Sequence, residues 1–218
     1  MEKYAKFAKA SYSMYKDGTK DRKERKAETS STIPAGFEID SGSDSKRSVF
    51  VNHKTKEVVI AHRGTVPTDT KDIVADLAIM ANVSGSTSRF QKAIAKDKKV
   101  KDKYKPLGYS IVVVGHSLGG KLAYESAKAN GLKAHVYNAA HGGSVIDAVV
   151  SKDKIKKALG LDTKKDKKAA KNITSYNTKL DPVSITSRNR NGTNVQVKTK
   201  KGKDVHTIDN FTKKVSKK

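Results

Sequence analysis

The sequence has 218 residues, of which 35% are hydrophobic and 31% charged, a balance typical of one well-buried globular domain. It contains no cysteine, which excludes a disulfide scaffold, a thiolate metal site and a cysteine nucleophile. Its 46 lysines and arginines against 22 acidic residues give a formal net charge of +24, which favours anionic partners.

The first half of the chain predicts helices around a short β-hairpin. Hydrophobic periodicity and turn residues indicate, in chain order, an amphipathic helix over 1–16, an exposed loop over 17–32, a strand from 37–39, a hairpin of 49–51 with 57–61, a helix over 71–81, a loop over 84–88 and a helix over 89–100.

The second half predicts strands alternating with helices. The expected elements are a strand over 108–115 buried on both faces, a helix over 118–130 that stops at Gly131, a strand over 135–138, a helix over 145–159, a strand over 173–176 and a final hairpin of 195–199 with 204–207. Such alternation is typical of α/β proteins. We expect a single domain over residues 1–218, built as a three-layer sandwich with a mostly parallel sheet and helices on both faces.

The segment from Gly115 to Gly119 has the pattern G-x-S-x-G, and it lies between the buried strand and the helix after it. This is the context of a nucleophile elbow, in which a sharp turn lifts the serine hydroxyl clear of the sheet. The glycines let the crossing backbones approach without Cβ clashes, and the helix N-terminus favours a developing oxyanion. Ser117 is therefore the predicted nucleophile.

A serine nucleophile needs a base, and the base needs a carboxylate that orients it. We favour Asp181, since it follows the strand over 173–176 and Pro182 holds it in an extended conformation. The other acidic residues downstream of Ser117 that we considered are Asp147, Asp153, Asp162, Asp166, Asp204 and Asp209.

Among the histidines, His206 at the end of the predicted final hairpin is the favoured base. His141 lies in a glycine-rich loop at the same edge of the sheet and remains a competitor. His135 begins a predicted strand and should lie at the far end of the sheet. His116 is adjacent to the serine, but its side chain should point away from it and serve packing.

The oxyanion hole needs two backbone N–H groups, one of them from an earlier strand end. Leu118 follows the nucleophile and supplies one candidate N–H group. Thr65, after the strand that ends in Ala61-His62-Arg63-Gly64, supplies the other. The alternative is that this strand merely terminates at Gly64.

These residues resemble the fungal-type (class 3) lipases, a branch of the α/β-hydrolases, over about residues 49–211. The resemblance is carried by an oxyanion strand in which His62 replaces the usual phenylalanine of F-R-G-[ST], and by blocks over 72–77, 114–120, 176–183 and 205–211. It implies a triad of Ser117, Asp181 and His206, with Thr65 and Leu118 as the oxyanion pair. The chain departs from the family at 137–143, where a G-x-P-R-x-G stretch is common, and it is shorter and more basic.

The expected function is a serine-dependent carboxylic-ester hydrolase that acts through an acyl-enzyme, with lipid esters as the favoured substrates and no metal or organic cofactor. In the resembling family the helix at 71–81 is a lid over the active site, and here a fixed core helix is the alternative. The alternative function is a non-catalytic basic protein that keeps the lipase fold and binds an acidic partner or, without sequence specificity, nucleic acid.

The basic stretches at 16–26, 92–105, 152–171 and 198–218 are rich in lysine and poor in arginine and aromatic residues. The favoured interpretation is a set of solvated helix faces and loops, and the alternatives are an anionic membrane surface or binding of nucleic acid without sequence specificity. The sequence shows no secretory leader and no apolar run long enough to span a bilayer. These features favour an intracellular or virion-associated location over secretion.

Overall fold

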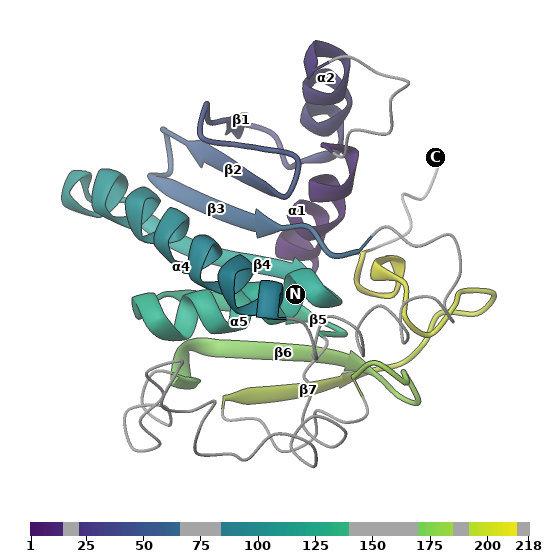
Figure 1. Cartoon of the computed structure of the whole chain (residues 1–218). Coiled ribbons are helices and arrows are strands. Elements are labelled where there is room, and N and C mark those ends of the chain that lie inside the picture. The colour runs from purple at the N-terminus through teal and green to yellow at the C-terminus, as the bar shows by residue number, and fades with distance from the viewer. Residues whose placement is uncertain (15–21, 66–83, 140–169, 185–191, 213–218) are drawn as a thin grey trace.

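A central sheet, shown in the computed structural model of Figure 1, organises the described part of the chain, which comprises residues 1–14, 22–65, 84–139, 170–184 and 192–212. Its strands are adjacent in chain order: β1 (Glu38–Ile39), β2 (Arg47–Asn52), β3 (Glu57–His62), β4 (Ser110–His116), β5 (Lys133–Tyr137), β6 (Ile173–Thr178) and β7 (Thr193–Val197). The pairs β1–β2 and β2–β3 are antiparallel, whereas β3 to β7 are all parallel. The predicted hairpin and the mostly parallel sheet are confirmed.

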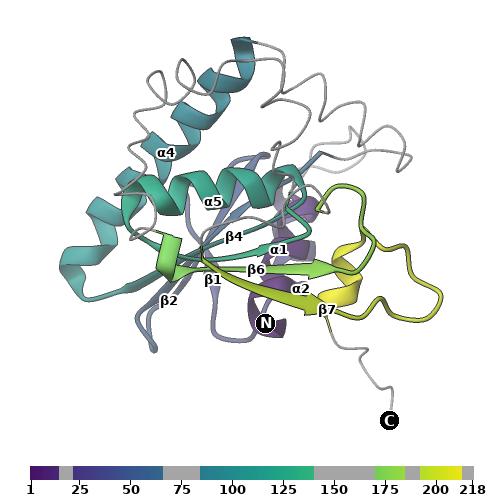
Figure 2. The same ribbon diagram turned by 90° about the horizontal axis from the view of Figure 1, so that it is seen from below.

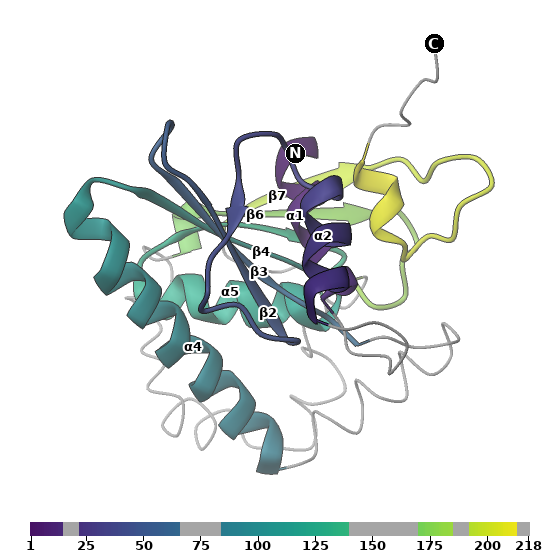
Figure 3. The same cartoon turned by 90° about the horizontal axis from the view of Figure 1, so that it is seen from above.

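Helices cover both faces of this sheet (Figures 1 and 3). On one face lies α1 (Glu2–Ser13), against which α2 (Arg22–Thr32) packs, together with the short 3₁₀ helix η4 (Ile208–Phe211). On the other face lie α4 (Ser84–Tyr104) and α5 (Leu118–Asn130). Short 3₁₀ turns, η1 (Lys105–Leu107) and η2 (Ala170–Asn172), precede β4 and β6. The predicted three-layer arrangement is therefore confirmed.

Side chains of the central strands alternate between two apolar clusters, as the period of two in a β-strand requires. Val58 and Ile60 of β3 face the cluster that includes Val100 of α4. Val59 and Ala61 of the same strand face the cluster built on α1. Both faces of the strand are buried, which explains why the sequence of β3 is a nearly continuous apolar run.

Two of the predicted loops are helical. Residues 22–32, expected to be an exposed loop, form α2, because arginine, lysine, glutamate and alanine are strong helix formers and α1 supplies a packing surface. Thr29 is fully buried, and its hydroxyl donates to the carbonyl of Arg25 at 2.7 Å. Residues 84–88, also expected to be a loop, form the first turns of α4.

The predicted final hairpin is wrong, because β7 pairs in parallel with β6 and no strand forms over 204–207. The predicted turn does occur, since the N–H of Lys203 donates to the carbonyl of Lys200 at 3.1 Å. Beyond it, the Asp204 carboxylate accepts the backbone N–H of His206 at 2.7 Å, and Asn210 donates to the Asp204 carbonyl at 2.8 Å. These side-chain hydrogen bonds occupy backbone groups that a β-strand over 204–207 would need for pairing with a neighbouring strand.

The predicted helices over 71–81 and 145–159 lie outside the described residues. Within the described part of the chain, none of the helices combines the length and the apolar character that crossing a membrane would need.

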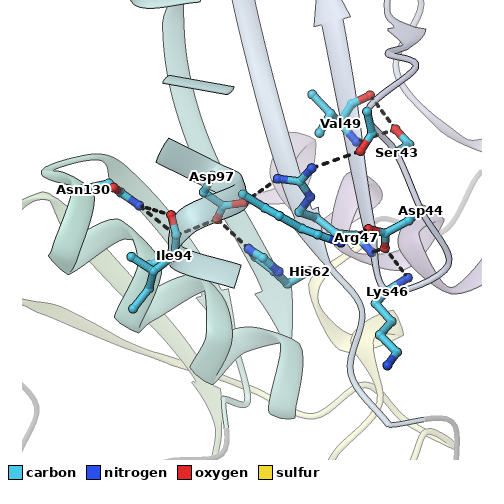
Figure 4. Close-up of polar contacts among 12 residues, drawn as sticks. Ser43, Asp44, Lys46, Arg47, Val49, His62, Ile94, Asp97 and Asn130 are labelled. Atoms are coloured by element: carbon cyan, nitrogen blue, oxygen red, sulfur yellow. Dashed lines mark hydrogen bonds and ion pairs between the residues drawn. The ribbon is translucent and has the colours of Figure 1, made fainter. Parts of the chain in front are cut away.

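A buried polar cluster fastens the end of β3 to α4 and α5 (Figure 4). Asp97 of α4 is fully buried, and its carboxylate accepts hydrogen bonds from Arg47 at 3.0 Å, His62 at 2.7 Å and Ser126 at 2.6 Å. Burial by itself raises the pKa of this carboxyl, but the charges and hydrogen bonds of these partners outweigh burial and hold the pKa below its usual range.

Replacing Asp97 tests this cluster. We expect Asp97→Asn to lower the free energy of unfolding by about 3–5 kcal/mol, because it leaves Arg47 buried without its counter-charge. Since the pKa of Asp97 is lowered, the stabilisation is present above about pH 4 and is lost as the pH falls below it. Urea denaturation at several pH values measures both effects.

Asp102→Asn is the matched control, because this aspartate lies on the same helix in an exposed ion pair with Lys98. It should change the unfolding free energy by about 0.5 kcal/mol or less. An equal effect of the two substitutions would contradict a special role of the buried cluster.

Candidate active site

Ser117 occupies the sharp turn between β4 and α5. Its backbone angles are φ 58° and ψ −127°, a conformation that a non-glycine residue adopts only at a cost of about 1–3 kcal/mol. The turn is fixed on both sides, since the N–H of Ser117 donates to the carbonyl of Tyr137 at 3.0 Å and its carbonyl accepts from Lys121 at 3.2 Å. The predicted strand–turn–helix context of Ser117 is therefore present.

Glycines around Ser117 allow three backbone segments to touch. A Cβ atom on Gly119 would lie 2.2 Å from the carbonyl oxygen of His62, at the end of β3. A Cβ atom on Gly115 would lie 2.1 Å from the carbonyl oxygen of Gly119, and one on Gly120 would lie 2.6 Å from Cβ of Ala139. The first turn of α5 therefore lies directly against the chain that follows β3 and β5.

His206 and Asp181 meet beyond the ends of β6 and β7, where Figure 2 shows the following loops at one end of the sheet. Nδ1 of His206 lies 2.8 Å from Oδ1 of Asp181, and both side chains are buried. The backbone N–H groups of Val183 and Ser184 donate to the Asp181 carboxylate at 3.3 and 2.9 Å. Because the carboxylate accepts only, Nδ1 of His206 carries the proton and Nε2 is the free lone pair.

The loop of His206 is held by the ends of neighbouring strands. The carbonyl of Val205 accepts hydrogen bonds from Asn138 at 2.9 Å and from the hydroxyl of Thr178. The carbonyl of His206 accepts from Nε2 of His116 at 2.6 Å. The His116 ring also packs on the His206 ring, with centroids 4.8 Å apart, so the prediction that His116 serves packing captured only part of its role.

His116, the immediate neighbour of Ser117 in the chain, brings Ser117 and the loop of His206 to the same end of the sheet. We call this end of the sheet the rim. Among the described residues, however, Nε2 of His206 is buried without a hydrogen-bond partner, so its bond to the Ser117 hydroxyl is not formed.

The residues predicted for the oxyanion hole also lie at this rim. The chain at 62–65 packs against the first turn of α5, which begins at Leu118. Arg63 anchors this segment, since its backbone N–H donates to Lys46 at 3.0 Å and its Nε donates to the carbonyl of Ser45 at 2.8 Å. In the described part of the chain, the buried hydroxyl oxygen of Thr65 has no hydrogen-bond partner.

The remaining candidates have other partners or lie outside the described residues, and the Asp204 carboxylate accepts the backbone N–H of His206, not its ring. His135 is in the middle of β5, not at its start as predicted, and it stacks on Tyr4 with ring centroids 4.4 Å apart. Asp209 forms an ion pair with Lys9, at 2.7 Å. The candidates outside the described residues are His141, Asp147, Asp153, Asp162 and Asp166.

Metal binding has no support in the part of the chain that the structure describes, where no three histidine or acidic side chains cluster closely enough to hold an ion.

Two residues at the rim were not predicted from the sequence. Asn138 accepts the N–H of Thr178 at 2.8 Å and donates to the carbonyl of Val205, so it joins the ends of β5 and β6 to the His206 loop. Its position at the end of the strand predicted over 135–138 was the available signal. Tyr12 contacts His116 from α1, and no local pattern points to it.

Comparison with known proteins identifies a family and a fold. Residues 4–217 match the family model described as Phospholipase-like, Tle-like phospholipase domain. No match was found among curated protein sequences.

Solved structures of fungal lipases share the fold. The non-glycosylated LIP2 lipase of Yarrowia lipolytica is 19% identical, with a TM-score of 0.52 over 95% of this chain and 81% of that one. A second structure of this lipase, at 1.7 Å resolution, is 18% identical, with a TM-score of 0.50 over 90% and 77%. Lipase II of Rhizopus niveus is 16% identical, with a TM-score of 0.52 over 90% and 79%. The predicted α/β-hydrolase fold and the resemblance to class 3 lipases are confirmed.

Gly119→Ala tests the close approach at the elbow. The added Cβ atom would lie 2.2 Å from the His62 carbonyl oxygen, so α5 has to move away from β3. We expect a loss of about 1–3 kcal/mol or more in unfolding free energy, measured by thermal and urea denaturation.

Gly131→Ala, at the other end of α5, is the control. Its Cβ atom would meet no atom within 4 Å, and only its left-handed backbone, with φ 64°, opposes alanine. The expected cost is about 1 kcal/mol. A smaller effect at Gly119 than at Gly131 would contradict the tight packing of the elbow.

Proposed function

Because the chain belongs to the family of the Tle-like phospholipase domain, we propose that it is a serine hydrolase that cleaves the carboxylic ester bonds of phospholipids. The observation that carries the proposal is the orientation of His206, whose Nδ1 is bound to buried Asp181 while its Nε2 is unpartnered in the described chain. A base held in this way is ready to take a proton. The strained turn at Ser117 supports the choice of nucleophile.

In the first half of the proposed reaction, the hydroxyl oxygen of Ser117 attacks the ester carbonyl carbon and its proton passes to Nε2 of His206. The negative charge of Asp181 stabilises the imidazolium that results and keeps the ring in its orientation. The tetrahedral intermediate then collapses. The bond to the leaving alcohol breaks, His206 returns its proton to that alcohol, and an acyl-enzyme remains on Ser117.

In the second half, water enters in place of the alcohol and gives a proton to His206. Its oxygen attacks the acyl carbon, and the second tetrahedral intermediate releases a fatty acid while Ser117 recovers its proton. The products are one carboxylic acid and one alcohol, and no metal or organic cofactor takes part in the proposal.

The backbone N–H groups of Thr65 and Leu118 are the proposed oxyanion hole. Support comes from the packing of the 62–65 segment on the first turn of α5 and from the N-terminal position of Leu118 in that helix. Such donors cost no reorganisation when charge develops, and the loss of one typically costs about 3–4 kcal/mol of transition-state stabilisation.

The basic surface suits the proposed substrate, because phospholipid surfaces that carry anionic head groups attract lysine side chains by about 1 kcal/mol each. Exposed lysines occur along α4, including Lys92, Lys98 and Lys99. The alternative of a non-catalytic protein that binds nucleic acid or an acidic partner is not favoured, since the family and the structural relatives are lipid hydrolases.

Substitution of the proposed triad tests the reaction. Ser117→Ala and His206→Ala should each lower kcat/KM for a phospholipid or a short-chain nitrophenyl ester by at least ~10³-fold, because each removes a member of one unit. Wild-type protein should also be labelled at Ser117 by a fluorophosphonate, as mass spectrometry of the labelled peptide would show.

His53→Ala is the control for histidine loss, since His53 is exposed and bonds to Glu38 and to Tyr109, which lies before the start of β4, at the other end of that strand from the elbow. It should leave kcat/KM unchanged. Hydrolysis that survives in Ser117→Ala, or labelling at another residue, would contradict the proposed nucleophile.

Binding to lipid vesicles tests whether the lysine-rich surface attracts the protein to anionic lipids. Ser117→Ala, which is expected not to consume the lipid, should co-sediment with vesicles that contain phosphatidylglycerol and not with phosphatidylcholine alone. Added salt should weaken the binding steeply, because it screens exposed charges. Binding that does not change between 50 mM and 500 mM salt, or that is equal on both lipids, would count against an electrostatic surface.

A further inference from the structure

Tyr12, in the last turns of α1, reaches two of the segments that form the rim. Its hydroxyl oxygen lies 3.0 Å from Nδ1 of His116, directly before Ser117. Gly64, in the segment that ends at Thr65, packs against the same hydroxyl. The contact is close, since a Cβ atom on Gly64 would lie 2.5 Å from that oxygen.

His116 connects Tyr12 to a third segment of the rim, the loop that contains His206. Its Nε2 lies 2.6 Å from the carbonyl oxygen of His206, and a carbonyl only accepts, so Nε2 carries the proton. Nδ1 is then the acceptor, and the Tyr12 hydroxyl donates to it. Burial, together with the nearby His206, lowers the pKa of His116 to about 3, so the ring stays neutral at physiological pH and keeps this tautomer.

The result is one directional chain of hydrogen bonds, from the Tyr12 hydroxyl through His116 to the His206 carbonyl, with Gly64 packed against the Tyr12 hydroxyl. It joins the proposed oxyanion segment, the neighbour of the proposed nucleophile and the backbone of the proposed base. Both bonds of the His116 ring favour the same tautomer, because the His206 carbonyl needs a donor at Nε2 and the Tyr12 hydroxyl then finds an acceptor at Nδ1.

We infer that Tyr12 and His116 are positioning residues, which hold the backbone of His206 at a fixed distance from the oxyanion segment through this chain of hydrogen bonds. The inference rests on the proposed function. Neither side chain has to touch the substrate, and a displacement of about 1 Å between reacting groups is enough to slow a reaction by ~10²-fold.

Tyr12→Phe tests the inference, because it keeps the ring and removes only the hydroxyl. We expect kcat to fall by ~10- to 100-fold with KM nearly unchanged, and the rate of fluorophosphonate labelling at Ser117 to fall in parallel. Backbone amides over 62–65 and 204–207 should also exchange with deuterium faster than in the wild type.

Tyr4→Phe is the matched control on the same helix. The Tyr4 hydroxyl donates to Oε1 of Glu57 at 3.0 Å, at the start of β3 and away from the rim. Tyr4→Phe removes an equivalent hydrogen bond and should leave kcat, the labelling rate and exchange in both segments unchanged. A loss of kcat equal to that of Tyr12→Phe would overturn the inference, since it would show a general response to a loosened α1.

His116 provides the second variant. His116→Gln keeps an N–H group that can reach the His206 carbonyl and should retain more of kcat than His116→Leu, which has the bulk without the donor. Equal kcat in the two variants would overturn the role of the donor, even if both are less stable than the wild type.

The outcomes separate this inference from the function on which it rests. A wild-type chain that neither hydrolyses esters nor labels at Ser117 overturns both. An active, labelled wild type whose Tyr12→Phe variant keeps full kcat overturns the inference alone. An active wild type with slow Tyr12→Phe, unaffected Tyr4→Phe and partial rescue by His116→Gln supports both.

Discussion

The close packing of the rim depends on glycines, which have no side chain, in and just before the first turn of α5. Gly115, Gly119 and Gly120 leave no Cβ atom between this turn and its neighbours, and the carbonyl of His62 would lie 2.2 Å from a Cβ on Gly119. This contact brings the ends of β3, β4 and β5 together, and it holds Ser117 in a strained conformation that a looser turn would release. The strain is offset by the packing around it.

Burial explains why the polar groups at the rim are so extensively paired. Asp181 accepts from its own loop as well as from His206, and Asp97 accepts from three donors beside the end of β3. A desolvated charge without partners would be very costly. In the described chain, buried atoms that remain unpartnered include Nε2 of His206 and the hydroxyl of Thr65, both beside the proposed reaction centre. In a folded protein such exceptions often have a functional reason.

Charge acts at two ranges in this molecule. The net charge of +24 is spread over flexible lysines, so it acts at long range on the encounter with anionic surfaces and is weakened by salt. At the rim, contacts are short and screened from water, and they depend on geometry. Burial of His116 shows this, because it keeps the ring neutral despite the carboxylates of Asp181 and Asp209 nearby.

The sequence by itself determined β4, the turn at Ser117 and α5, because an apolar run, two glycines and Gly131 act within a few positions of one another. It also pointed to Asp181 and His206, whose side chains the structure joins. Only the tertiary structure decided that β7 runs parallel to β6, and that Tyr12 meets His116 across 104 positions of the chain. Periodicity reports which face of a segment is buried, whereas these contacts depend on how distant segments pack, which no local pattern encodes.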